Sequence, residues 1–279
     1  MTEPRRSIEQ VTAVLSDMDG TLYVSDRLIP GADALVQGLR DRGVPLLFLT
    51  NNSSARAVKY RDRLRRLGIP ADNEEILTSG AATAEWLRDH TEHRSVLLLG
   101  TPALREEFEE TGFTVLDARD RAEPDCVVVG FDKTLTYARL ERACLVLAEG
   151  CPYYATHPDF TCITDRGLIP DTGAMIAAIE TVVHRRPRII GKPMPEMVEA
   201  GLARLAARAR PGVEISAART AILGDQLDTD MTMANRAGLF GVLVLSGETS
   251  PERLQAQNEV LPDLVVGSVA ELIEPLARG

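Results

Sequence analysis

Long apolar runs are absent from this 279-residue chain, and no segment approaches the about 20 residues of a membrane-spanning helix. The N-terminal stretch MTEPRRSIEQ also lacks the apolar centre of a signal peptide. Cysteine is scarce, because only Cys126, Cys144, Cys151 and Cys162 occur and no two of them form a CxxC pair. We therefore expect reduced thiols in a cytoplasmic protein that has no membrane partner.

Basic residues are fewer than acidic ones, so the formal net charge is -10 and the isoelectric point is near 5.0. A nucleic-acid-binding protein normally carries a basic stripe, and the nearest candidate is the run Arg61–Arg66. That run interleaves with Tyr60, Leu64 and Leu67, which favours a solvated helix face over a nucleic-acid surface. An acidic protein that binds an anion must build its positive site locally, from a divalent cation and a lysine or arginine.

What the sequence does contain is a regular alternation of strand and helix patterns. Strands are expected near 11–17, 44–52 and 74–80, with helices near 30–43, 53–68 and 81–90. A second series follows, with strands near 95–100, 126–132 and 151–157, and then a loop around Asp159 and Gly167. The first pattern resumes at Arg188. This order predicts an α/β fold, a doubly wound parallel sheet with helices on both faces.

Polar residues follow four of the expected strands, at the point where each strand ends. Ligands of an open parallel sheet bind outside the carboxyl ends of its strands, so we expect the four groups to meet in one crevice. Each short motif is weak evidence alone, and the set in this order is much stronger. The groups are Asp17 with Asp19, Thr50 with Asn51 and Asn52, Gly191 with Lys192, and Asp225 with Asp228 and Asp230.

These residue types suit phosphoryl transfer. Asp17 and Asp225, with the backbone carbonyl of Asp19, offer oxygen ligands of the kind that Mg²⁺ prefers. A carboxylate held in line with phosphorus can attack it, and a carboxyl two residues later can move the protons. The donors for a bound dianion would be Lys192, Thr50 and the backbone at Gly20.

At these residues the chain resembles the haloacid dehalogenase-like (HAD) phosphohydrolases. DMDGT (17–21) resembles their first motif, Thr50 in LTNNS the second, Lys192 in GKP the third, and GDQLDTD (224–230) the fourth. The combination of LTNNS with GDQLDTD is most similar to the NagD-like and p-nitrophenylphosphatase branch. That branch includes phosphatases of glycerol phosphate, phosphoglycolate, sugar phosphates, nucleotides and pyridoxal phosphate.

The resemblance implies a role for each matched residue. Asp17 would be the nucleophile, and Asp19 the general acid and base with its carbonyl on Mg²⁺. Asp225 would bind Mg²⁺, with Asp230 as a further or supporting ligand, while Asp228 stays open between a ligand and an exposed carboxylate. The phosphate-binding residues would be Thr50, Asn51, Asn52, Lys192 and Gly20.

The resemblance also implies a Rossmann-like core with an inserted α/β cap. Too few residues separate Asp17 from Thr50 to hold a cap, whereas the stretch from Thr50 to Lys192 is long enough. We expect a core of residues 1–82 and 188–279 and a cap of residues 83–187. Within the cap, His157, Asp159 and Arg166 are candidates for substrate specificity, although His157 is equally explained as a structural turn residue.

The expected function is Mg²⁺-dependent hydrolysis of small phosphomonoesters, such as sugar phosphate, glycerol phosphate, phosphoglycolate or nucleoside monophosphate. The acid at position 19 favours phosphate esters over halides, because a departing halide needs no proton. Two alternatives remain open: a phosphotransferase or mutase that uses the same aspartyl phosphate, and a non-catalytic phosphometabolite sensor. Members of this branch often dimerise through the cap, so a homodimer is a further expectation.

Overall fold

The computed structural model describes residues 7–164, 166–257 and 259–278, and its contacts divide the chain into two compact units. The first unit contains the residues up to Thr50, Ala57–Leu77 and the residues from Val198 onward. The second contains Asn51–Arg56 and Thr78–Met197. The expected cap of residues 83–187 falls inside the second unit, and its boundaries stay a prediction.

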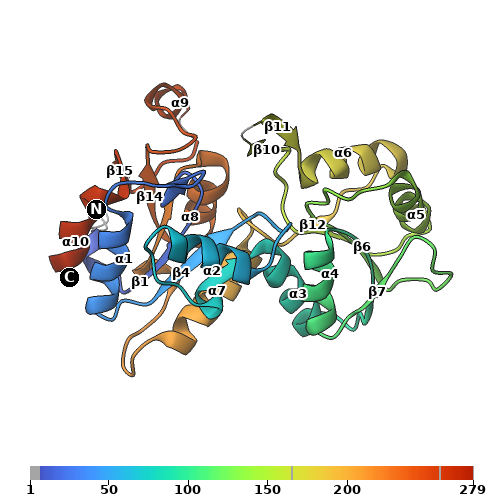
Figure 1. Cartoon of the computed structure of the whole chain (residues 1–279), viewed down its shortest axis with the longest axis horizontal. Coiled ribbons are helices and arrows are strands. Elements are labelled where there is room, and N and C mark those ends of the chain that lie inside the picture. Colours follow the sequence, from blue (N-terminus) through green and yellow to red (C-terminus); the bar gives the residue numbers. More distant parts are fainter. Residues whose placement is uncertain (1–6, 165, 258, 279) are drawn as a thin grey trace, which may run out of the picture. The chain divides into compact units, whose positions relative to one another are not determined.

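The first unit is built on a six-stranded sheet with the strand order β15-β14-β13-β1-β4-β5 (Figure 1). β1 pairs in parallel with β13 and β4, and β14 pairs in parallel with β13 and β15. All residues of β1, β4, β13 and β14 are buried, as is typical of parallel strands covered on both faces. The predicted α/β fold with a parallel sheet is confirmed. The strands are β1 (Ala13–Ser16), β4 (Leu46–Thr50), β5 (Ile76–Thr78), β13 (Thr220–Gly224), β14 (Phe240–Val244) and β15 (Leu264–Val266).

Helices connect these strands in the order that the sequence pattern predicts. α1 buries Ala32, Leu35, Val36 and Leu39, which recur at the spacing of one helix face. A short antiparallel hairpin, β2 (Tyr23–Val24) with β3 (Arg27–Leu28), follows β1. The helices wholly or mainly in this unit are α1 (Ala32–Asp41), α2 (Ala57–Arg66), α7 (Pro195–Arg208), α8 (Thr232–Ala237), α9 (Pro251–Ala256) and α10 (Ile273–Arg278).

The second unit has its own five-stranded parallel sheet, in the order β12-β9-β8-β6-β7. Alternate residues of its central strands point to opposite faces, because side chains in a strand have a period of two. Leu97 and Leu99 join one hydrophobic cluster with Val146 of α5 (Tyr137–Ala148). Val96 and Leu98 join another with helices α3 (Ser79–His90) and α4 (Pro102–Glu110). The strands are β6 (Ser95–Leu99), β7 (Thr114–Leu116), β8 (Cys126–Val129), β9 (Tyr153–Ala155) and β12 (Arg188–Ile189).

The helices of this unit begin at recognisable caps. Thr101 accepts a hydrogen bond from the N–H of Leu104 and precedes Pro102, so both the hydroxyl and the fixed proline φ favour a helix start. Asp171 caps α6 by accepting a bond from the N–H of Thr172. The helices are α3 (Ser79–His90), α4 (Pro102–Glu110), α5 (Tyr137–Ala148) and α6 (Thr172–Val183).

Two sequence-based expectations are wrong. The segment around Asp159 and Gly167 is not simply a loop, since it forms an antiparallel hairpin of β10 (Thr161–Thr164) and β11 (Gly167–Pro170). The four polar strand ends do not belong to one sheet either. β12, which leads to Lys192, pairs with β9 in the five-stranded sheet, and only tertiary pairing could reveal that.

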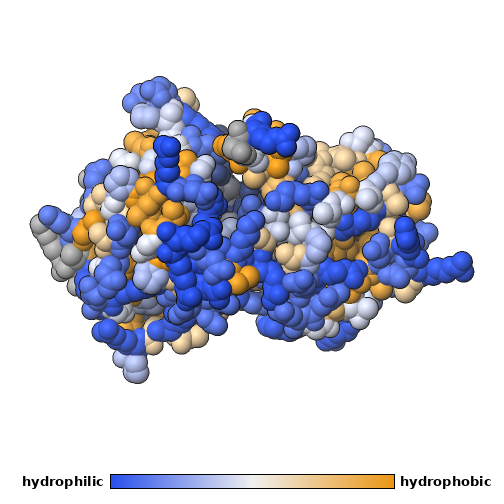
Figure 2. Space-filling view, viewed as in Figure 1, coloured by the Kyte–Doolittle hydropathy of each residue, from blue (hydrophilic) through white to orange (hydrophobic). Residues whose placement is uncertain are grey.

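The surface differs in character between α2 and the β10–β11 hairpin. Figure 2 shows hydrophilic surface over α2, the helix that contains most of the arginine run, and hydrophobic surface at the β10–β11 hairpin. Phe160, Ile163 and Leu168 are 65%, 71% and 68% exposed there. Among the helices that the structure describes, none combines the length and apolar character needed to cross a bilayer.

Candidate active site

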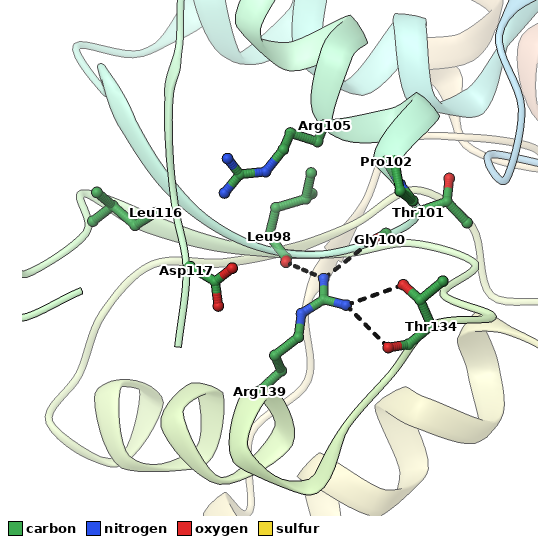
Figure 3. Close-up of a pocket in the computed structure, with 9 residues that line it drawn as sticks. All are labelled: Leu98, Gly100, Thr101, Pro102, Arg105, Leu116, Asp117, Thr134 and Arg139. Carbon is green, nitrogen blue, oxygen red and sulfur yellow. Dashed lines mark hydrogen bonds between the residues drawn. The ribbon is translucent and has the colours of Figure 1, made fainter. Parts of the chain in front are cut away.

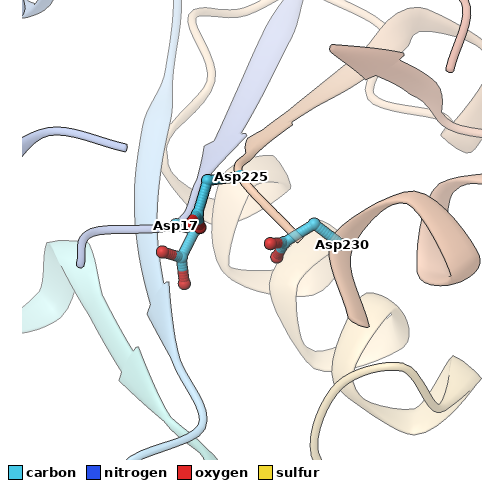
Figure 4. Close-up of side chains that lie close together, drawn as sticks. All are labelled: Asp17, Asp225 and Asp230. Carbon is cyan, nitrogen blue, oxygen red and sulfur yellow. The ribbon is translucent and has the colours of Figure 1, made fainter. Parts of the chain in front are cut away.

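Three buried aspartates meet at one edge of the six-stranded sheet (Figure 4). Asp17 follows β1 and Asp225 follows β13, and these strands pair in parallel, so their carboxyl ends coincide. Asp230 lies in the π-helical turn Leu227–Met231, and its carboxylate points toward the other two. One oxygen from each residue lies within 4.8 Å of the others. Buried carboxylates this close favour the binding of a hard divalent cation among them. The set of oxygen donors fits Mg²⁺.

A loop after β14 completes this edge of the sheet, and the sequence analysis missed it. The N–H of Glu248 donates to Asp225 Oδ2 at 2.6 Å, and the Ser246 hydroxyl donates to the carbonyl of Gly20 at 2.8 Å. A Cβ at Gly247 would lie 2.0 Å from Asp225 Oδ2, and one at Gly20, where φ is +82°, would lie 2.3 Å away. Only glycine fits so close to a carboxylate. The available signal was the pair Ser246 and Gly247, which comes one residue after the end of β14.

Asp19 lies in a different environment from Asp17. Its side chain is 56% exposed, whereas Asp17 is buried. The Tyr23 hydroxyl donates to Asp19 Oδ2 at 3.3 Å, and Arg63 Nη1 lies 3.7 Å from Asp19 Oδ1. Burial first, and then the negative charge of Asp19, raise the pKa of Tyr23 far above its ordinary value, so Tyr23 stays a donor. The two aspartates therefore have surroundings suited to separate tasks.

Arg63 is a second residue that the sequence analysis missed. The sequence favours a solvated face for the Arg61–Arg66 run, but the Arg63 guanidinium lies 4.6 Å from the centre of the Tyr23 ring and beside Asp19. Asp228 gives the opposite result. Its side chain is 78% exposed and pairs with Arg253 at 2.6 Å, which favours the exposed-carboxylate interpretation.

In the second unit, Asn51 holds the backbone of Lys192 on both sides. Asn51 Oδ1 accepts the Lys192 N–H at 2.9 Å, and Asn51 Nδ2 donates to the Lys192 carbonyl at 3.0 Å. Lys192 is itself buried. Asn52 is used differently, because its Oδ1 accepts the N–H and the hydroxyl of Ser54 and so forms an Asx turn. Thr50, in the first unit, ends β4 as a buried residue.

His157 and Asp159 join this arrangement. His157 is fully buried, with Nδ1 at 3.2 Å from Asp159 Oδ2 and Nε2 at 2.9 Å from the Thr172 hydroxyl. Asn51 Nδ2 donates to Asp159 Oδ2 at 3.0 Å. Burial acts to raise the pKa of Asp159, but His157, Asn51 and the Lys192 charge outweigh it and lower that pKa. For Asp171, burial dominates over His157 and raises the pKa.

The specificity candidates therefore differ in access. Because His157 is enclosed, any effect that it has on substrate choice must pass through its neighbours. Arg166 is exposed on the β10–β11 hairpin, where its N–H donates to the Thr164 hydroxyl. The assignment of these residues to substrate specificity stays a prediction.

A cavity of about 180 Å³ lies at the carboxyl ends of β6 and β7 in the second unit (Figure 3). Arg139 lines it, but its guanidinium donates to the carbonyls of Leu98 and Gly100 at 2.8 and 3.0 Å and pairs with Asp132 at 2.6 Å. The arginine is thus engaged as a clamp between β6 and the segment after β8. We assign this cavity a structural role.

Two family descriptions match the chain: haloacid dehalogenase-like hydrolase over residues 14–114, and HAD-hydrolase-like over residues 189–272. The chain is 33% identical to the ribonucleotide monophosphatase NagD of Escherichia coli, over 93% of this chain and 97% of that protein. Its structure is similar to that of a 4-nitrophenylphosphatase from Thermotoga maritima, with a TM-score of 0.88 and 38% identity over 96% and 98% of the chains. A glycerol phosphate phosphatase from Mycobacterium tuberculosis, in complex with magnesium, gives a TM-score of 0.83 and 31% identity over 98% and 78%.

Proposed function

Because the chain belongs to the haloacid dehalogenase-like hydrolases, as a phosphatase of small phosphomonoesters in the NagD and p-nitrophenylphosphatase branch, we propose that it works through a phospho-aspartate on Asp17. Asp19 is the general acid and base in this proposal. The single observation that carries it is the convergence of Asp17, Asp225 and Asp230 within 4.8 Å, next to the exposed Asp19.

Mg²⁺ is the cofactor that fits these ligands best. Three carboxylates supply hard oxygen donors, and Mg²⁺ takes a small number of them together with water and phosphate oxygens. We assign Asp17, Asp225 and Asp230 as side-chain ligands, with the Asp19 carbonyl as a further one. The ion, when bound, neutralises the negative charge that the carboxylates and the phosphoryl group bring together. The related glycerol phosphate phosphatase, determined with magnesium, supports this choice.

The protein's own residues carry the two chemical steps. An Asp17 oxygen attacks phosphorus, and the bond from phosphorus to the ester oxygen breaks while Asp19 gives that oxygen a proton. Water then attacks the phosphorus of phospho-Asp17, Asp19 takes the proton of that water, and inorganic phosphate leaves with the Asp17 carboxylate restored. Asp19 is suited to exchange protons because its side chain is exposed and accepts a bond from Tyr23.

The remaining assignments concern the phosphoryl group. We propose that Lys192 supplies a fixed positive charge for it and that the Thr50 hydroxyl and the backbone at Gly20 donate hydrogen bonds. Asn51 supports Lys192 through its two backbone contacts. Asn52 has its side-chain oxygen turned to Ser54, so its part is to shape the loop.

For the substrate we propose a small phosphomonoester of the sugar phosphate, glycerol phosphate, phosphoglycolate or nucleoside monophosphate class. The similar proteins support this breadth, because their names refer to a ribonucleotide, a nitrophenyl ester and glycerol phosphate. Among the three cap candidates, we propose the exposed Arg166 as the one that contacts the leaving group.

Purified protein should release phosphate from p-nitrophenyl phosphate when Mg²⁺ is present and stop when EDTA removes the metal. The Asp17→Asn variant should lose about 10⁴-fold or more in kcat, because it lacks the nucleophile. Asp228→Asn is the control, since it removes an exposed acid from the same sequence motif. Full activity in Asp17→Asn would overturn the mechanism, and transfer to added alcohols that exceeds hydrolysis would favour a phosphotransferase.

A further inference from the structure

The side-chain amide of Asn51 has a fixed orientation. An asparagine amide presents one acceptor oxygen and one donor nitrogen, and rotation by half a turn exchanges them. Here Oδ1 faces the N–H of Lys192, and Nδ2 faces the Lys192 carbonyl and Asp159 Oδ2. The reversed amide would set oxygen against carboxylate and carbonyl oxygens, and nitrogen against an N–H. Asp159, an acceptor when ionised, therefore helps to decide which way the amide points.

Asp159 is itself held in its acceptor state. His157 Nδ1 lies 3.2 Å from the same Oδ2 that receives the Asn51 bond. The positive charge of Lys192 also favours the ionised form of Asp159. A carboxylate that accepts a hydrogen bond and lies beside an imidazole nitrogen is oriented, and the nearby lysine charge helps to keep it ionised.

The far side of His157 is anchored as well. Its Nε2 lies 2.9 Å from the hydroxyl of Thr172, at the start of α6. Asp159 precedes β10 and Asp171 follows β11, and backbone bonds close the base of the hairpin, from Asp171 N–H to Phe160 O and from Gly173 N–H to Asp159 O. The buried imidazole thus ties the base of the hairpin to Asn51 through Asp159.

We propose that Asp159 is a positioning residue for Lys192, acting through the amide of Asn51, with His157 as the residue that orients Asp159. The proposal rests on the proposed function, in which Lys192 binds the phosphoryl group. It differs from a role of Asp159 in choosing the leaving group. A positioning residue affects every phosphate ester alike and also inorganic phosphate, which has no leaving group. A specificity residue affects some esters and leaves phosphate binding unchanged.

The test compares wild type with Asp159→Ala, Asp159→Asn and the control Asp132→Asn. Asp132 is a buried aspartate of the same unit whose carboxylate pairs with Arg139. For each protein, kcat and KM are measured on p-nitrophenyl phosphate and on glycerol 3-phosphate. The affinity for inorganic phosphate is measured by calorimetry, and thermal unfolding shows whether each variant is folded.

For Asp159→Ala we expect kcat/KM to fall by the same factor on both esters, about 10–100-fold, with a similar loss of phosphate affinity. Asp159→Asn should recover part of the loss, because its amide oxygen can still accept the Asn51 bond. Asp132→Asn should unfold at a lower temperature but keep kcat/KM within about twofold of wild type.

Two results would overturn the proposal: an Asp159→Ala variant with wild-type phosphate affinity, or a loss confined to one ester. A failure of the proposed function looks different, because wild type would then hydrolyse no ester. The calorimetric comparison of phosphate binding would still decide the positioning role of Asp159 in that case.

Discussion

In the first unit, Asp17, Asp225 and Asp230 bring three carboxylates within 4.8 Å of one another. In the second, Asp159 Oδ2 accepts a hydrogen bond from Asn51 and lies 3.2 Å from His157 Nδ1, and Asp132 pairs with Arg139. Both regions bury acids. The second places side chains of Asn51 and Arg139 against its acids, whereas the first brings three carboxylates together, which fits a cation. A substitution in the first region should therefore change metal affinity. A substitution in the second should change the position of Lys192 or the stability of the fold and leave metal affinity unchanged.

The largest effect on metal binding is expected at Asp225. Asp225→Ala removes a proposed Mg²⁺ ligand and should lower kcat/KM by about 100-fold or more. A ligand that binds only the folded protein stabilises it, by about 2.7 kcal/mol at 100 times its Kd. We expect Mg²⁺ to raise the Tm of wild type and to leave that of Asp225→Ala almost unchanged. A wild-type Mg²⁺ response in the variant would contradict the assignment.

Lys192→Ala tests the other region. Loss of a charge aimed at the phosphoryl group should reduce kcat/KM by about 10²–10³-fold. The Mg²⁺-dependent rise in Tm should persist, because the proposed metal ligands are untouched. Loss of the Mg²⁺ response in this variant would break the distinction between the two regions.

Gly247→Ala examines how tightly the first region is built. The added Cβ would lie 2.0 Å from Asp225 Oδ2, so the loop or the carboxylate must move. We expect kcat/KM to fall by about 10–100-fold and the Mg²⁺ affinity to fall with it. Gly68→Ala is a control for stability, since its Cβ meets no atom within 4 Å although its φ of +91° strains the backbone.

Arg139→Ala should act on stability rather than on chemistry. It leaves Asp132 buried without its ion pair and removes two bonds to carbonyls of the β6 segment. Because the arginine side chain is 19% exposed, we expect the free energy of unfolding to fall by about 3 kcal/mol, at the low end of the range for breaking a buried ion pair. Denaturant unfolding measures this change in stability. An unchanged midpoint would contradict the role of Arg139 in joining β6 to the segment after β8.

The smallest effects are expected from Asp159→Asn and Asp171→Asn, and these two should have opposite pH dependence. The pKa of Asp159 is lowered in the folded protein, so its ionisation stabilises above the ordinary carboxyl pKa of about 4 and this contribution is lost as pH falls through the lowered value. The pKa of Asp171 is raised, so its contribution is full below about pH 4 and is lost as pH rises through the raised value. Unfolding free energies measured from pH 3 to 7 should show Asp159→Asn losing stability relative to wild type, and Asp171→Asn gaining it, as pH rises. If the plots of unfolding free energy against pH were parallel for wild type and both variants, the opposite pKa shifts assigned to Asp159 and Asp171 would be wrong.

Much of the first region could be predicted from the sequence. The run before Asp17 and the run before Asp225 are short, apolar and followed by acids, which is enough to predict two buried strands that end at a site. The loop at Ser246 and Gly247 was missed because small residues after a strand are common in turns. Arg63 was missed because its role depends on a neighbour 44 positions earlier, at Asp19.

The second region was harder to predict, for a physical reason. The sequence by itself determined the chemistry: which acids, amides and lysine occur, in which order, and on which alternation of strands and helices. Only the tertiary structure decided that β12 joins the five-stranded sheet, that His157 is enclosed, and that Asp159 meets Asn51. Local sequence fixes the periodicity of an element, whereas hydrogen bonds between residues about 100 positions apart depend on how the whole chain packs.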